Sequence, residues 1–258
     1  MSRARDLDGL GVVVTRPLEP ARVLARELEA RGARVFVFPA LAIQDLPPSA
    51  ELTATLDGLP QAALAIFVSA HAVERGLAAV RARRPWPQRV EVAAVGDATA
   101  RALRNSGFAR VISPPSRHDS EGLLELPRLQ SVRGENIIVF RGEGGREHLR
   151  EALEARGANV RYAECYRRVR PQSDASALLA AWDRGEVQAV SALSGETLEN
   201  FVEMLGEGAD GHLAETVLVV PHAAVGTHRD ARRFARVLVS EPGAEGLARE
   251  LSQLRVST

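Results

Sequence analysis

The sequence predicts an α/β protein with two open, parallel-sheet α/β domains that arose by internal duplication. Two observations lead to this prediction. Short apolar runs alternate with segments of helical periodicity along the chain, which is typical of parallel sheets built from right-handed crossovers. In addition, the six letters LEARGA occur at 28–33 and again at 153–158, an offset of 125 residues.

The same offset relates further landmarks in the same order. It carries Arg16 to Arg141 and Ser69 to Ser194, each after an apolar run. With a small change of offset, the letters FARV at 108–111 return at 234–237, and EGL at 121–123 returns at 245–247. A shared bias toward Ala, Arg, Glu and Leu is the alternative explanation, but six identical letters on a shared offset favour duplication.

Each predicted element follows from local patterning. A buried strand at 12–15 leads into a helix at 19–31, which has apolar residues at helical spacing and which Gly32 ends as a C-terminal cap. A strand at 35–38 stops at Pro39, and a short extended piece with Leu41 and Ile43 follows. The remaining predicted strands of the first unit are 64–68, 90–95 and 110–112, and its helices are 72–83, 98–106 and 121–129. The second unit repeats the pattern, with strands at 137–140, 160–163, 187–192, 217–220 and 237–240.

Composition excludes several classes of chemistry. The 258 residues include 33 basic side chains, and every one is an arginine because the sequence contains no lysine. Schiff-base lysine chemistry and a Walker A phosphate loop are therefore excluded. The net charge is zero, aromatic residues make up 4% and Cys165 is the single cysteine, so the sequence favours neither a nucleic-acid surface nor a multi-cysteine metal site.

Ligands of open α/β sheets bind beyond the carboxyl ends of the strands. We therefore expect the functional residues directly after the predicted strands, at Thr15, Arg16, Ser69, Gly96, Thr99, Arg141, Gly142, Ser194 and His222. Two connectors, 39–43 and 165–171, are expected between the domains. In the second of them, Tyr166 and Arg168 could line a cleft for a polyanion or form a solvated linker.

Simpler interpretations stay open for these residues. Ser69, Thr99, Ser194 and Ser120 all stand near predicted helix starts and could serve only as N-caps. The glycine-rich turn at 141–146 could hold an anion or be a plain strand-to-helix turn, and it does not fit a dinucleotide fingerprint. The serines lack a G-x-S-x-G elbow and the histidines lack H-E-x-x-H spacing, so a hydrolase and a metal site are not supported.

Taken together, these motifs resemble the uroporphyrinogen-III synthase family. The resemblance is carried by VTRP at 14–17, FVS at 67–69, AVG at 94–96 with Thr99, SEGLL at 120–124, RG at 141–142 and YRR at 166–168, all in family order. At the end of the chain Pro221 and His222 are kept, but Arg233 and Phe234 replace the glycine usual before the last strand. The order and spacing of the set, more than any single motif, indicate the family.

The resemblance implies a discontinuous first domain, 1–38 with 172–258, a second domain at 44–164 and a two-stranded connector formed by 39–43 and 165–171. It implies that linear hydroxymethylbilane is cyclised to uroporphyrinogen III, with inversion of the last pyrrole ring, loss of water and no cofactor. Tyr166 is then the candidate catalytic residue, donating a hydrogen bond or proton to the departing hydroxyl. The eight substrate carboxylates call for arginines and backbone N–H groups, chiefly Arg16, Arg141 and the helix starts.

Other function classes compete with this one. Two α/β lobes around a cleft also describe ligand-binding proteins, so a non-catalytic two-domain paralogue is the alternative. A nucleotide-dependent transferase is weakened by the missing phosphate fingerprint. The charged N-terminal residues and short apolar runs lead us to expect a soluble, cytoplasmic protein, with a linear tetrapyrrole as partner, no nucleic acid or membrane partner, and a monomeric state.

Overall fold

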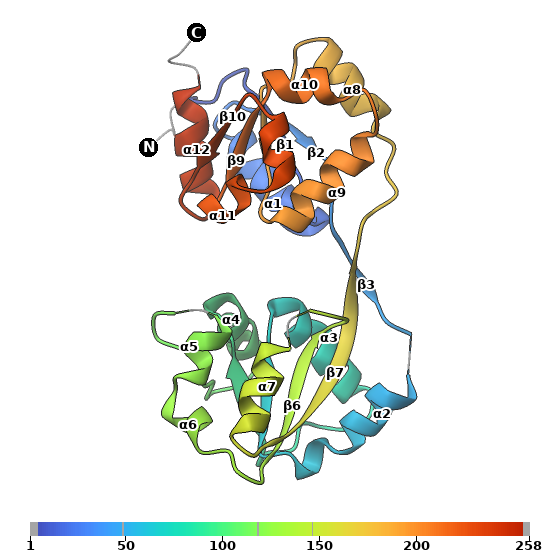
Figure 1. Ribbon diagram of the computed structural model, residues 1–258, viewed down its shortest axis with the longest axis vertical. Helices are drawn as coiled ribbons and strands as arrows, with labels where there is room; N and C mark the ends of the chain where they lie inside the picture. Colours follow the sequence, from blue (N-terminus) through green and yellow to red (C-terminus); the bar gives the residue numbers. More distant parts are fainter. Residues whose placement is uncertain (1–4, 48, 118, 146, 255–258) are drawn as a thin grey trace. The chain divides into compact units, whose positions relative to one another are not determined.

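The computed structural model describes residues 5–47, 49–117, 119–145 and 147–254. The chain divides into two compact units, Met1–Ala42 with Val169–Thr258 and Ile43–Arg168. Each unit is a mostly parallel α/β sheet covered by helices (Figure 1). No helix in the described part of the chain is long and apolar enough to cross a membrane.

The first unit contains a five-stranded sheet in the order β10-β9-β8-β1-β2. Its strands are β1 (Gly11–Val14), β2 (Arg34–Val37), β8 (Ala189–Ser191), β9 (Val217–Val220) and β10 (Arg236–Val239). Its helices are α1 (Leu18–Glu29), α8 (Ser176–Asp183), α9 (Gly195–Leu205), α10 (Asp210–Glu215), α11 (Ala223–Gly226), η2 (Arg229–Arg233) and α12 (Ala244–Gln253).

The second unit contains a five-stranded sheet in the order β3-β7-β6-β4-β5. Its strands are β3 (Ala42–Asp45), β4 (Leu64–Phe67), β5 (Glu91–Ala94), β6 (Asn136–Gly142) and β7 (Asn159–Val169). Its helices are α2 (Ala50–Asp57), η1 (Leu59–Gln61), α3 (Ala70–Arg81), α4 (Asp97–Asn105), α5 (Ser120–Leu124), α6 (Pro127–Gln130) and α7 (His148–Ala155).

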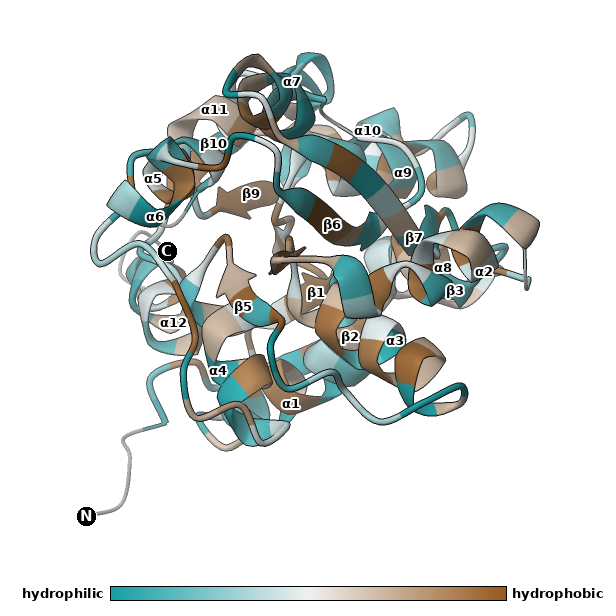
Figure 2. Cartoon of the chain, turned by 90° about the horizontal axis from the view of Figure 1, so that it is seen from below, coloured by the Kyte–Doolittle hydropathy of each residue, from teal (hydrophilic) through white to brown (hydrophobic). Residues whose placement is uncertain are grey.

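Alternation along the strands gives each sheet two apolar faces. In the first unit, Val12 and Val14 pack with the buried residues of α1 and α12, whereas Val13 packs with those of α8 and α9. In the second unit, Ile66 packs with α5, α6 and α7, and Phe67 packs with α3 and α4. The strands β1, β6 and β9 accordingly stand out as hydrophobic in Figure 2. Burial on both faces is what favours parallel strands over an open antiparallel sheet.

The strand registers confirm the duplication. Val12 of β1 pairs with Val35, and Ile137 of β6 pairs with Val160, so both pairs differ by the predicted 125 residues. β1 lies between β2 and β8, just as β6 lies between β7 and β4. At β9 and β10 the offset is 126, because Ala189 pairs with Val217 whereas Leu64 pairs with Glu91. The inserted residue indicated by the sequence therefore lies between β8 and β9.

Four predicted elements differ from the structure. Residues 110–112 form no strand and reach the sheet only through one bridge, Ala93 with Ile112. The helix expected at 121–129 is two short helices, α5 and α6, because Pro127 cannot continue α5 and starts α6 instead. The strand expected at 160–163 continues to Val169. The helix α2 lies in a segment for which we predicted none.

Candidate functional site

A cavity of about 230 Å³ lies beyond the carboxyl ends of β4 and β6 in the second unit. Its position at this edge of a parallel sheet is the one where α/β folds bind ligands. Six predicted site residues line it together: Ser69, Ser120, Arg141, Gly142, Tyr166 and Arg168. Its other lining residues are Val68, Val139, Gly144, Gly145, Leu149 and Tyr162.

Tyr166 is the polar group most firmly fixed in this cavity. Its side chain is 6% exposed, and its ring packs into the cluster that contains Phe67 and Phe140. Its hydroxyl lies 2.9 Å from Ser69 Oγ, and the ring of His71 meets its ring edge-on with centroids 6.0 Å apart. Burial of the ring fixes the position of the phenolic oxygen, which beside its contact with Ser69 Oγ can take part in one more hydrogen bond.

Gly142 is required by the packing of Tyr166. The register of β6 against β7 shifts between Arg141, which pairs with Glu164, and Gly142, which pairs with Tyr166. This bulge places the tyrosine ring over the glycine, where an added Cβ would lie 2.7 Å from the ring Cε2. Any larger residue must displace the ring, so Gly142 serves the site through its missing side chain.

Ser69 is an N-cap, as the simpler interpretation predicted, and it also contacts Tyr166. It is the N-cap of α3, where its Oγ accepts a hydrogen bond from Ala72 N at 3.0 Å. The same oxygen contacts the Tyr166 hydroxyl, 97 residues away in the chain. Because Oγ already accepts from the helix, its own proton is free to go to Tyr166 Oη when that tyrosine gives its proton away.

Arg141 lies in the cavity wall but is occupied by its own turn. It is 6% exposed, its guanidinium donates to the carbonyl oxygens of Gly142 and Gly144, and it pairs with Glu147 at 3.2 Å. Gly144 and Gly145 have φ of +70° and +101°, so the turn curls around the guanidinium in a conformation that favours glycine. The turn that we predicted to bind an anion is thus occupied by the guanidinium of Arg141. Arg146 of the same motif lies outside the described residues.

Sequence reasoning missed Tyr162. Two guanidinium groups lie over its ring, with Arg141 Cζ 4.3 Å and Arg150 Cζ 4.0 Å from the centroid, and its hydroxyl donates to Glu147 Oε2 at 3.0 Å. Burial, with the hydrogen bond to Glu147, raises the pKa of Tyr162 to about 12. Tyr162 packs on the sheet face covered by α5, α6 and α7, whereas the bulge in β7 turns Tyr166 to the opposite face with Phe67 and Phe140. The strand predicted at 160–163 contains Tyr162, but no sequence pattern indicates its contacts with Arg141, Arg150 and Glu147.

The other predicted residues of this unit contribute less. Ser120 is the first residue of α5, but the cap predicted there belongs to Asp119, whose Oδ1 accepts from Gly122 N at 2.8 Å. Arg168 is exposed on β7 at the cavity rim. Gly96 is the N-cap residue of α4, and Thr99 is buried on that helix. Neither of these last two lines the cavity.

Four predicted residues belong to the first unit, at the carboxyl edge of its sheet. Thr15 is completely buried and donates from Oγ1 to Ser191 O at 2.7 Å, which ties β1 to β8. Ser194 is the N-cap of α9, accepting from Thr197 N at 3.2 Å, so the capping interpretation is confirmed there as for Ser69. His222 is exposed directly after β9 and makes no capping hydrogen bond.

Arg16, the fourth of these residues, differs from its duplicate Arg141. Its Nε is buried and, within the described part of the chain, has no hydrogen-bond partner. Burial lowers the pKa of Arg16, which Glu27 partly opposes. At the offset of 125, Gly144 and Glu147, which engage Arg141, correspond to Glu19 and Arg22. The carboxylate that pairs with the duplicate arginine is thus replaced by a second arginine, and an anion would supply the acceptor that Arg16 Nε lacks.

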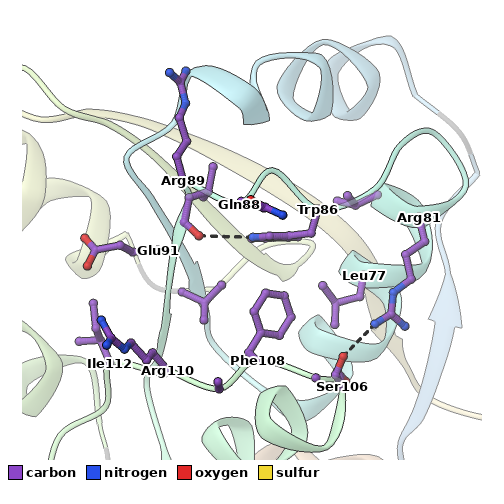
Figure 3. A pocket seen from close by; sticks show the side chains of 15 residues that line it. Leu77, Arg81, Trp86, Gln88, Arg89, Glu91, Ser106, Phe108, Arg110 and Ile112 are labelled. Carbon is purple, nitrogen blue, oxygen red and sulfur yellow. Dashed lines mark hydrogen bonds between the residues drawn. The ribbon is translucent and has the colours of Figure 1, made fainter.

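A larger cavity of about 530 Å³ lies at the opposite edge of the second sheet, next to the start of β5 (Figure 3). It contains none of the predicted site residues, and its walls include the Trp86 and Phe108 rings. We therefore place the catalytic candidate at the smaller cavity. No cluster of three or more His, Cys, Asp or Glu residues suited to a metal ion occurs among the residues described.

Comparisons with known proteins agree with one another. The profile of a family described as "Uroporphyrinogen-III synthase HemD" matches residues 22–249. Uroporphyrinogen-III synthase of Escherichia coli is 32% identical over 76% of this chain and 80% of its own length, and that of Salmonella typhimurium is 35% identical over 74% and 78%. In fold, a mutant uroporphyrinogen III synthase from Thermus thermophilus matches with a TM-score of 0.63 and 20% identity, covering 95% of this chain and 99% of that one.

Proposed function

The chain belongs to the uroporphyrinogen-III synthase family, and we propose that it cyclises linear hydroxymethylbilane to uroporphyrinogen III with Tyr166 as the acid. The reaction makes it a cyclising lyase of tetrapyrrole biosynthesis. The observation that carries the role of Tyr166 is its buried ring and oriented hydroxyl, held by Ser69 Oγ at 2.9 Å at the carboxyl edge of the second sheet. The alternative hypothesis, a non-catalytic paralogue, gives no reason for this arrangement of Tyr166 and Ser69.

The substrate dictates what the protein must do. When the hydroxymethyl oxygen leaves as water with one added proton, the electron-rich pyrrole becomes an azafulvene cation. That cation closes spontaneously to the symmetric isomer, so the protein must direct attack to the substituted carbon of the last ring, through a spiro intermediate. A proton lost from the pyrrole system at the end balances the proton added at the start. Control of geometry is therefore the main task, and acid assistance is the second.

Tyr166 is placed to add the first proton. As its proton moves to the leaving oxygen, the hydroxyl of Ser69 can turn its own proton toward the phenolate, because Ser69 Oγ is anchored by Ala72 N at 3.0 Å. The α3 helix, which spans 12 residues, adds the positive end of its dipole at the same point. Negative charge developing on Tyr166 is thus met without reorganising the site.

The carboxylates of the substrate require cations, and Arg16 is the better candidate of the duplicated pair. Its half-buried guanidinium carries an unsatisfied Nε, whereas Arg141 is engaged by Gly144 and Glu147. We propose that Arg16 binds a substrate carboxylate and that Arg141 fixes the glycine-rich turn behind Tyr166. Arg168 at the cavity rim and exposed His222 complete the proposed binding set, together with the N–H groups at the starts of α3 and α9.

The test is the isomer formed from freshly prepared hydroxymethylbilane without added metal or nucleotide. We expect the type III isomer from the wild-type protein. Tyr166→Phe removes one hydroxyl and should lower kcat about 5-fold to 150-fold, equivalent to about 1 to 3 kcal/mol, with KM little changed. Formation of the type I isomer alone would refute the activity. An unchanged kcat in Tyr166→Phe would refute only the role of the tyrosine.

We also propose that the protein acts as a monomer in the cytoplasm. The proposed chemistry uses Tyr166 and Ser69 of one chain and needs no second copy. Sedimentation of the purified chain at the concentration of the assay, and fractionation of the source cells, would test these two points.

A further inference from the structure

The cavity near the start of β5 has its own construction. It lies between the end of α3, the 82–90 loop, the first residues of β5 and the segment that follows α4. Figure 3 shows Phe108 in its centre, with Trp86 above the ring and Leu77 beside it. The Trp86 and Phe108 rings meet edge-on, with centroids 5.1 Å apart at 85°. The lining is apolar and aromatic inside, with polar groups at its margin.

The equivalent region of the first unit forms a complete strand pair and shows how the second unit differs. There the letters FARV run into β10, which pairs with β9 over four residues, from Arg236 with Val217 to Val239 with Val220. Phe234 is 7% exposed in that unit. In the second unit the same four letters at 108–111 form no strand, and Ile112 alone bridges to β5. The cavity therefore occupies the place of a lost strand pairing.

Trp86 holds this edge open. In the first unit, Ala235 N donates to Thr216 O at 3.0 Å. The equivalent carbonyl at an offset of 126 is that of Val90, and it accepts instead from the indole Nε1 of Trp86 at 3.3 Å. An aromatic side chain thus takes over a backbone hydrogen bond, so the opening is satisfied and packed and is not a defect of the sheet.

The charges at the margin are mostly positive. Arg81 uses one N–H to donate to Ser106 O at 3.1 Å. Arg110 is exposed, and no ion pair of its guanidinium is found among the described residues. The one carboxylate in the lining, Glu91, is neutralised by Arg128 at 2.6 Å. Arg89 points away from the cavity in Figure 3 and donates to Pro60 O at 2.7 Å. A bound ligand would therefore contact aromatic rings and one arginine whose charge is not neutralised by a carboxylate.

We propose that this cavity is a second binding site, separate from the catalytic one, for a small organic anion with a flat aromatic body. The volume of about 530 Å³ suits a molecule of two or three rings. Its rings would pack against Trp86 and Phe108, and its acidic group would face Arg110. The site lies at the amino edge of strands whose carboxyl edge holds Tyr166, so it is independent of the proposed reaction.

The test uses 8-anilinonaphthalene-1-sulfonate as probe. We expect one saturable site per chain and energy transfer from tryptophan to the probe. Only Trp86 and Trp182 are present, so the transfer should persist in Trp182→Phe and disappear in Trp86→Phe. Arg110→Ser should weaken binding about 10-fold, as expected for one charged hydrogen bond. The neutral N-phenyl-1-naphthylamine should bind about equally to wild type and Arg110→Ser.

The duplication provides the matched control. Arg236 is the equivalent of Arg110 in the closed copy and is also exposed, so Arg236→Ser should leave probe affinity unchanged. Equal losses in both arginine variants would show only non-specific attraction of an anion and would overturn the proposal. Energy transfer that persists in Trp86→Phe and is lost in Trp182→Phe would also overturn the proposal. So would a probe signal that falls as the protein concentration rises and the chain dimerises. Circular dichroism of each variant separates loss of the site from loss of the fold.

Discussion

Replacement of Ser69 by alanine tests the proposed site most sharply, because one oxygen has two separable functions. Its Oγ accepts from Ala72 N at 3.0 Å, which caps α3, and contacts Tyr166 Oη at 2.9 Å, which orients the acid. Ser69→Ala removes both contacts. Ser69→Thr keeps a hydroxyl for both and should restore most of the lost activity, since threonine also serves as an N-cap.

The two losses have different sizes and different readouts. Loss of the cap should lower the free energy of unfolding by about 1 kcal/mol. Loss of the contact to Tyr166, a neutral hydrogen bond of about 0.5 to 1.5 kcal/mol, should lower kcat about 2-fold to 13-fold. KM should change little, because the carboxylates of the substrate are bound by other groups. Steady-state kinetics and urea unfolding measure these effects separately.

A double-mutant cycle with Tyr166→Phe shows whether Ser69 acts through the tyrosine. Once the phenol is removed, Ser69→Ala should cost no further activity, although it should still cost stability. Ser49 provides the control, because its Oγ caps α2 through Leu52 N at 3.0 Å without touching the site. Ser49→Ala should lose stability and keep kcat. Additive losses in the cycle, or an equal loss of kcat in Ser49→Ala, would refute the coupling.

Four further outcomes are expected. Gly142→Ala places a Cβ 2.7 Å from the Tyr166 ring and should lower kcat at least 10-fold while the protein stays folded by circular dichroism, an effect of about 1.4 kcal/mol. Arg16→Gln should raise KM, whereas Arg141→Gln should lower the unfolding midpoint because it empties a buried turn; the reverse pattern would exchange their proposed roles. Burial raises the pKa of the Cys165 thiol to about 12, so Ellman's reagent should react with it only after unfolding. The pKa of Tyr162 is raised to about 12, so its neutral form should add to the free energy of unfolding fully below pH 10, and this contribution should be lost as the pH rises toward 12. Tyr162→Phe should abolish that part of the pH dependence of the free energy of unfolding.

The sequence predicts the fold well because periodicity and duplication are local or repetitive signals. The apolar runs at 12–15, 64–68 and 217–220 become β1, β4 and β9 within one or two residues. The offset of 125 correctly indicates that the two copies share one register, because Val12 with Val35 and Ile137 with Val160 are equivalent pairs. The misplaced strand at 110–112 shares its Arg-Val pair with β10, but the carbonyl of Val90, whose counterpart Thr216 accepts from backbone in the first unit, accepts from Trp86 instead.

The site could be predicted only in part, because its geometry depends on long-range contacts. Position after strands brought Ser69, Arg141 and Gly142 to one cavity, whereas Tyr166, expected in the connector, lies within β7 and lines the same cavity. The pairing of Ser69 with Tyr166 depends on a bulge that shifts the register between Arg141 and Gly142, and no local pattern announces a bulge in a parallel pair. The capture of Arg141 depends likewise on glycines with positive φ, which the sequence shows only as a flexible turn.

The duplication explains why the two halves of the chain have different roles in the proposed reaction. The residue equivalent to Tyr166 is Leu41, and the residue equivalent to Gly142 is Pro17, so the first unit has neither the phenol nor the bare backbone on which the ring packs. Conversely, the glycines and the glutamate that occupy Arg141 are absent around Arg16, whose buried Nε is left for a ligand. In the proposed reaction, the acid and the carboxylate-binding cation are thus assigned to corresponding edges of the two copies of one fold. Restoring symmetry should therefore add nothing: Pro17→Gly combined with Leu41→Tyr should gain no second acid, because the first unit has no bulge that would bring a tyrosine onto that glycine.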